Sequence, residues 1–173
     1  MKDIKTKMEL KDALEVLETD SGFQEWKSSN EDSFLAHAFT MVDGDHDGNY
    51  QFGFYNKDDT MTTFDAGAGG VVQGASDEIF KKPESTIHPL AKEDIQIPFV
   101  KALYAAEKLQ ATEFAGESPL KIMVILQHLP EHGAVYNITY ITNAMKALNM
   151  RVSSVDGSVV KKQLTPLTEF KTE

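Results

Sequence analysis

Residues 49–56, NYQFGFYN, place aromatic side chains at alternate positions, with polar residues or glycine between them. Alternation with a period of two predicts a β-strand with one apolar face, and aromatic residues are typical of strands. A second stretch with this pattern, VYNITYIT, occupies residues 135–142. Tyr50 and Tyr136, which open the two patterns, are 86 residues apart in a chain of 173 residues. A shift of about half the chain length indicates an internal repeat.

Two further pairs of segments keep a similar spacing. The helical pattern DALEVLE at residues 12–18 matches KALYAAE at residues 101–107 with a shift of 89 residues. The Val-Val pairs that begin at Val71 and Val159 are shifted by 88 residues. We therefore predict an α+β fold made of two similar units, each a helix packed on an antiparallel sheet.

The unit boundaries follow from composition. Residues 1–75 form the first predicted unit and residues 97–173 the second. Between them, residues 76–96 are predicted to be a linker, because they are polar and contain Pro83 and Pro89, which discourage regular structure. One helix over one small sheet would be marginally stable, so the two units are expected to form a single compact body.

Local signals mark the ends of the predicted helices. Thr6 and Glu9 have the spacing of a capping box, and apolar residues then follow at helical intervals. This helix is expected to bend or restart at residues 20–22 and to continue to about residue 28. The helix of the second unit is expected to begin near Pro98, where a missing N–H costs nothing.

The second half resembles a known family. Residues 101–109, KALYAAEKL, and residues 136–163, YNITYITNAMKALNMRVSSVDGSVVKKQ, are similar to the PepSY domain, which has an Ala-rich helix, an aromatic-rich strand and a closing hairpin. The hairpin pattern is carried by Val152, Val155, Asp156, Gly157, Val159 and Val160. The resemblance covers residues 97–163, and residues 8–74 through the repeat. It implies a non-catalytic domain that binds or restrains peptidases.

Charge and composition limit the partners. There are 27 acidic and 17 basic residues, a net charge of −10, so nucleic acid and anionic membrane surfaces would be repelled. A protein or peptide partner is therefore expected to be neutral to basic. The chain has no cysteine, which excludes disulfides, thiolate metal sites and a cysteine nucleophile.

No stretch approaches the ~18 consecutive apolar residues of a membrane helix, and no targeting segment is seen. The sequence thus predicts a soluble, cytoplasmic protein without membrane insertion. A secreted protein that has lost its signal segment would look the same.

An acidic loop, DGDHDG at residues 43–48, begins like a calcium site. Asp43, Asp45 and Asp47 stand at alternate positions before Gly48, as in the helix-loop-helix calcium loop. That loop also needs a bidentate glutamate at its twelfth position, where this chain has Phe54. A solvated hairpin loop is therefore favoured, with weak cation binding by the three aspartates as the alternative.

No catalytic motif stands out, and no cofactor is predicted. The glycines of GAGGVVQG, residues 67–74, lack the Gly-Lys-Ser/Thr ending of a phosphate loop, and no serine lies in a Gly-x-Ser-x-Gly elbow. Aromatic residues on the sheet faces either pack under a helix or form a binding surface. The candidates for such a binding surface are Tyr50, Tyr55, Tyr136 and Tyr140. We predict a non-catalytic protein- or peptide-binding module; the alternatives are a calcium-dependent binding protein that uses residues 43–49 and an enzyme with an unrecognised site.

Overall fold

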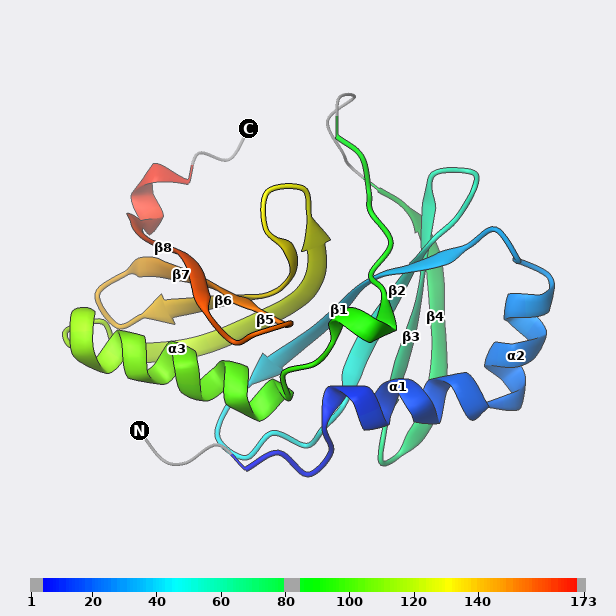
Figure 1. The fold of residues 1–173 in the computed structure, drawn as a ribbon, viewed down its shortest axis with the longest axis horizontal. Helices are drawn as coiled ribbons and strands as arrows, with labels where there is room; N and C mark the ends of the chain where they lie inside the picture. Colours follow the sequence, from blue (N-terminus) through cyan, green and yellow to red (C-terminus); the bar gives the residue numbers. More distant parts are fainter. Residues whose placement is uncertain (1–4, 80–84, 171–173) are drawn as a thin grey trace.

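The computed structural model describes residues 5–79 and 85–170. Within these ranges the chain forms eight strands and three α-helices, an α+β fold as predicted (Figure 1). The helices are α1 (Leu10–Thr19), α2 (Ser21–Ser28) and α3 (Phe99–Glu113). The first four strands are β1 (Phe34–Val42), β2 (Tyr50–Tyr55), β3 (Thr60–Gly67) and β4 (Gly70–Glu78). The other four are β5 (Pro119–Leu129), β6 (Gly133–Thr142), β7 (Lys146–Ser153) and β8 (Val159–Pro166).

All eight strands belong to one antiparallel sheet with the order β4-β3-β2-β1-β5-β6-β7-β8. Each half of the sheet is a meander of four consecutive strands, and the first strands of the two meanders, β1 and β5, pair with each other. Phe39 of β1 lies opposite Ile125 of β5 at this central pairing. The pairing of β1 with β5 therefore joins the two halves of the chain into one continuous sheet.

The three helices cover one face of this sheet, with α1 and α2 over the first meander and α3 over the second (Figure 1). Alternation along the strands sends one set of side chains under the helices, where they form a continuous apolar core. The ring of Phe99 joins the two halves, because it contacts Tyr50 and Tyr136, at centroid distances of 5.4 and 6.1 Å. The opposite face of the sheet carries no helix among the described residues.

The predicted break between the first two helices is confirmed. Helix α1 ends at Thr19, and the carboxylate of Asp20 accepts a hydrogen bond of 2.9 Å from the backbone N–H of Phe23, which caps α2. The predicted capping box is wrong. Glu9 is the N-cap residue of α1 but makes no side-chain cap there; its carboxylate instead reaches the start of α3.

The predicted linker is shorter than expected at its beginning. Strand β4 runs to Glu78 and pairs with β3 over its whole length, so residues 76–78 belong to the sheet. Residues 80–84 of the predicted linker lie outside the described residues. Further along, Leu90 and Ile95 are buried in the core, and the N–H of Leu90 donates to the carbonyl of Leu35 at 2.8 Å. The end of this segment thus packs against the sheet.

The helices are too short or too polar to cross a membrane, as far as residues 5–79 and 85–170 are concerned.

Candidate functional site

Three of the four tyrosines proposed for a binding surface are core residues. Tyr50, Tyr136 and Tyr140 are at most 1% exposed, because their strand positions face the helices. They cannot form an exposed surface, and the core alternative holds for them. Tyr55 points to the opposite face, is half-buried, and donates its hydroxyl to the carboxylate of Asp59.

Two of these buried hydroxyls bind the backbone just before a helix. Tyr50 donates to the carbonyl of Met8 at 3.0 Å, two residues before α1 begins. Tyr136 donates to the carbonyl of Ile97 at 2.7 Å, two residues before α3 begins. The hydroxyl of Tyr140 has no partner among the described residues. These tyrosines therefore have structural roles.

The acidic loop between β1 and β2 does not gather its carboxylates around a common centre. Asp47 accepts hydrogen bonds from the backbone N–H and the side-chain amide of Asn49, each 2.9 Å, and the backbone bond is the main cause of its lowered pKa. Asp43 and Asp45 are exposed. Within the described ranges, no group of three or more acidic or histidine side chains is placed to hold a metal ion.

The loop is instead shaped by packing against the N-terminal segment. His46 is 3% exposed, and its carbonyl accepts from the N–H of Lys7 at 3.2 Å. Gly48 has a positive φ of 81°, and an added Cβ there would lie 2.6 Å from the Cβ of Met8. The glycine that resembles the sixth position of a calcium loop is thus required by the turn and by this close approach.

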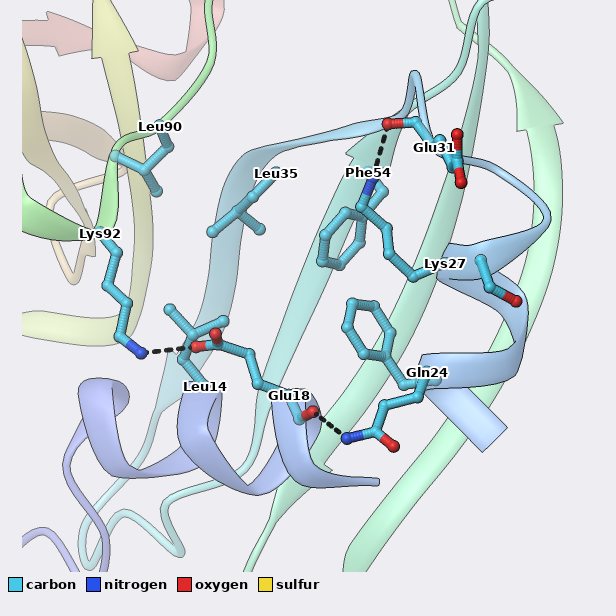
Figure 2. A pocket seen from close by; sticks show the side chains of 11 residues that line it. Leu14, Glu18, Gln24, Lys27, Glu31, Leu35, Phe54, Leu90 and Lys92 are labelled. Carbon is cyan, nitrogen blue, oxygen red and sulfur yellow. Dashed lines mark hydrogen bonds and ion pairs between the residues drawn. The ribbon is translucent and has the colours of Figure 1, made fainter. Parts of the chain in front are cut away.

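A concavity with an apolar floor lies between α1, α2 and the start of β1 (Figure 2). We call it the α1–α2 cavity; its volume is about 640 Å³, within the range of small-molecule and side-chain pockets. Its apolar lining comes from α1, α2, β1, β2 and the segment before α3, and consists of Leu14, Phe23, Leu35, Phe54 and Leu90. Apart from Leu35, which is partly buried, these residues are at most 7% exposed.

Lys27 stands at one side of the cavity, but its ammonium group is occupied. Its Nζ donates to the carbonyls of Asn30, Glu31 and Ser33 at 3.3, 2.9 and 2.7 Å. These three bonds use all three donors of an ammonium group. Lys27 therefore ties the end of α2 to the segment that leads into β1, and Figure 2 shows it reaching toward Glu31.

The opposite rim is closed by an ion pair between two segments distant in sequence. Lys92 and Glu18 are joined by a 2.8 Å contact between Nζ and Oε1 (Figure 2). This hydrogen bond raises the pKa of Lys92, so its amine stays protonated and is unsuited to act as a base or a nucleophile. Gln24 donates its side-chain amide to the carbonyl of Glu18 at 3.1 Å. The rim is polar, but most of its hydrogen-bonding groups already have partners.

The chemistry of this cavity favours binding an apolar group. Its floor offers aliphatic and aromatic carbon, and its lysines are committed to carbonyls or to a carboxylate. The sequence gives no signal for this cavity, because the local pattern around Leu14, Phe54 and Leu90 predicts an ordinary core residue in each case. Only the fold brings them around one hollow.

Comparison with known proteins gives a fold relationship. No family model and no curated protein matches the sequence. A solved structure described as a "putative lipoprotein" from Clostridium difficile 630 superposes with a TM-score of 0.52 at 15% sequence identity. The match covers 86% of this chain and 97% of the other chain. At this identity the likeness shows a shared fold and carries no function.

Proposed function

We propose that this chain is a non-catalytic module that binds a protein or peptide segment and seats one apolar side chain of it in the α1–α2 cavity. The observation that carries the proposal is that the cavity has an apolar floor and that the lysines on its sides already have hydrogen-bond partners. The floor is apolar, while Lys27 and Lys92 on its sides are engaged in hydrogen bonds that stabilise the fold. An apolar anchor that enters this hollow leaves water, which contributes roughly 25 cal/mol per Å² of apolar surface that it buries.

The partner segment is expected to be neutral to basic around its apolar anchor. The chain carries a net charge of −10, and the exposed residues Glu18 and Glu31 line the cavity. Lys27 already donates to the carbonyl of Glu31 and Lys92 to the carboxylate of Glu18, so neither lysine is free to attract an acidic partner. Complementary charge speeds encounter and like charge suppresses it, so an acidic segment would associate poorly.

We also infer that the chain consists of two similar PepSY-like units, residues 8–74 and 97–163. The paired bonds of Tyr50 to Met8 and of Tyr136 to Ile97 support this inference, since each fixes a strand to the residue two positions before a helix. The mirrored order of the two four-strand meanders also supports it. The resemblance to PepSY domains suggests a peptidase as one class of partner.

A peptide panel tests the proposal. Labelled peptides would carry one central leucine or phenylalanine and flanking residues that are basic, uncharged or acidic, with a matched set in which serine replaces the anchor. Binding would be followed by anisotropy at low and high salt. We expect anchored basic peptides to bind best and to lose affinity with salt, and the serine set to bind at least about tenfold more weakly.

The same samples distinguish binding from catalysis. Peptides and a set of peptidases would be incubated with the chain, and peptide integrity and peptidase activity would be measured. The proposal expects bound peptides to remain intact and allows inhibition of a peptidase. Multiple turnover of a peptide by this chain alone, or equal affinity for anchored and serine peptides, would contradict it.

A further inference from the structure

The face of the sheet opposite the helices carries an ordered row of side chains that crosses all eight strands. The strand register places one residue of each strand in this row, and Asp65 and Arg151 stand at equal distances from its centre, one in each meander. From β4 to β8 the row reads Val72, Asp65, Gln51, Phe39, Ile125, Asn137, Arg151 and Lys161. Its centre is therefore apolar, its first half acidic and its second half basic.

The middle of this helix-free face is open and apolar. Phe39 and Ile125 are half-buried at the junction of β1 and β5, next to the pair Met41 and Met123 in the same two strands. Met41 is 43% exposed. A shallow hollow of about 390 Å³ lies beside them and is lined by His37, Phe39, Gln51, Ile125 and Gln127. Apolar surface of this kind at the centre of a sheet is typical of an interface.

The charges on the two sides have no partners within the described part of the chain. Asp65 is exposed and makes no ion pair or side-chain hydrogen bond there, and neither does Arg151. Burial of the Arg151 Nε without a hydrogen-bond partner is costly, whereas a guanidinium group is well suited to a carboxylate. The row thus presents opposite charges on either side of an apolar centre.

We propose that the helix-free face binds a second copy of this chain in a twofold-symmetric dimer. The axis would run between β1 and β5, within about 15° of the strand direction, so that the strands of the two copies cross at about 30°. Rotation about this axis places the acidic half of one row over the basic half of the other. Asp65 then faces Arg151 of the second copy, Gln51 faces Asn137, and Phe39 faces Ile125. Each relation occurs twice, as an isologous interface requires.

Sheet geometry limits the strength of this dimer. Two twisted sheets that pack face to face lie at about −30° to each other, so their centres touch while their outer strands diverge. The central six strands, spaced by about 4.8 Å, span about 29 Å. Five residues of each strand add a length of about 17 Å, so each copy offers about 500 Å². A total near 1,000 Å² is at the low end for specific interfaces. The dimer is therefore expected to dissociate on dilution, with a dissociation constant in the micromolar range.

Charge reversal provides a specific test by sedimentation equilibrium. The wild-type chain, of 19.2 kDa, should approach twice that mass as its concentration rises. Asp65→Arg and Arg151→Asp should each weaken dimerisation by about tenfold or more, because each places like charges together at two positions. The double variant Asp65→Arg/Arg151→Asp should restore it, since the pairs are then opposite again. Glu25→Arg, on exposed α2, is the matched control and should leave the dissociation constant unchanged.

Circular dichroism and thermal melting would establish that every variant is folded. A wild-type chain that stays at 19.2 kDa up to about millimolar concentration would overturn the proposal. A dimer that is unaffected by either single reversal would place the interface elsewhere and would overturn it too. Failure of the double variant to recover would show that Asp65 and Arg151 do not face each other. None of these results depends on occupancy of the α1–α2 cavity.

Discussion

The carboxylate of Glu9 caps helix α3, which begins 90 residues later with Phe99. Its Oε2 accepts the N–H of Phe99 at 2.7 Å, and its Oε1 accepts the N–H of Val100 at 3.1 Å. Glu9 is also the N-cap residue of α1. One side chain therefore joins the starts of the two helices that cover the two halves of the sheet. A negative charge at this place also complements the positive end of the α3 dipole.

Replacement of Glu9 should destabilise the whole chain, since two N–H groups of α3 lose their acceptor. We expect Glu9→Ala to lower the free energy of unfolding by about 1–2 kcal/mol in a urea titration. Glu9→Gln should cost less, because an amide oxygen can still accept one bond. Glu25→Ala is the control at an exposed helical glutamate. Equal stability of Glu9→Ala and Glu25→Ala would show that the cap contributes nothing.

Removal of single tyrosine hydroxyls should separate the two kinds of buried tyrosine. Tyr50→Phe and Tyr136→Phe each lose a hydrogen bond to a backbone carbonyl, and each should lower stability by about 1 kcal/mol. Tyr140→Phe removes a hydroxyl that has no partner among the described residues, so it should be neutral or slightly stabilising. Urea titrations of the three variants give the comparison. A large loss in Tyr140→Phe alone would contradict this assignment.

Stability should fall steeply in alkaline solution. Burial raises the pKa of Tyr50, Tyr136 and Tyr140 above the ordinary value of about 10. The folded chain then holds these phenolic protons while the unfolded chain releases them. Their contribution to stability is therefore complete below about pH 10 and is lost as the pH rises beyond it, by about 1.4 kcal/mol per pH unit for each tyrosine.

Absorbance at 295 nm measures this effect directly. The phenolate signal of the three buried tyrosines should appear together with unfolding rather than before it. Unfolding of Tyr136→Phe should release one proton fewer at high pH, so its unfolding free energy should decline less steeply with pH than that of the wild type. Reversible ionisation of all tyrosines in the folded chain would contradict the assigned burial.

Calcium should change the thermal stability little. Asp47 is engaged by Asn49, and Asp43 and Asp45 are exposed. A ligand stabilises by RT ln(1 + [L]/Kd), which is small for a weak site at millimolar calcium. Thermal melts with calcium and with a chelator should therefore nearly coincide. A micromolar calorimetric isotherm that disappears in Asp45→Ala would show that the loop is a specific site.

Local patterns were sufficient to predict much of the fold. Period-two alternation predicts β2 and β6, and residues 20–22 predict the break between α1 and α2. Alternation alone does not tell which strand face the helices cover, so the sequence leaves Tyr50 and Tyr136 open between a binding surface and the core. The face is decided by tertiary packing, here by the rings around Phe99.

Long-range contacts were beyond the reach of these patterns. Glu9 has the spacing of a local capping box, but its acceptors are used by N–H groups 90 and 91 residues away. The α1–α2 cavity also depends on distant residues, because Leu14, Phe54 and Leu90 meet only when the sheet and helices assemble. The spacing of residues in one sequence does not predict contacts between residues that are far apart in it.

Blocking the α1–α2 cavity tests the proposed binding function most directly. Ser28 is exposed on α2 and lines the cavity, whereas Ser21, at the start of the same helix, does not. The measurement is the dissociation constant of the best anchored basic peptide for Ser28→Phe and for the control Ser21→Phe. We expect Ser28→Phe to weaken binding by about tenfold or more, as a filled pocket loses its apolar contact, and Ser21→Phe to bind like the wild type. Equal affinity of both variants, with both folded, would contradict the proposal that the cavity receives the partner.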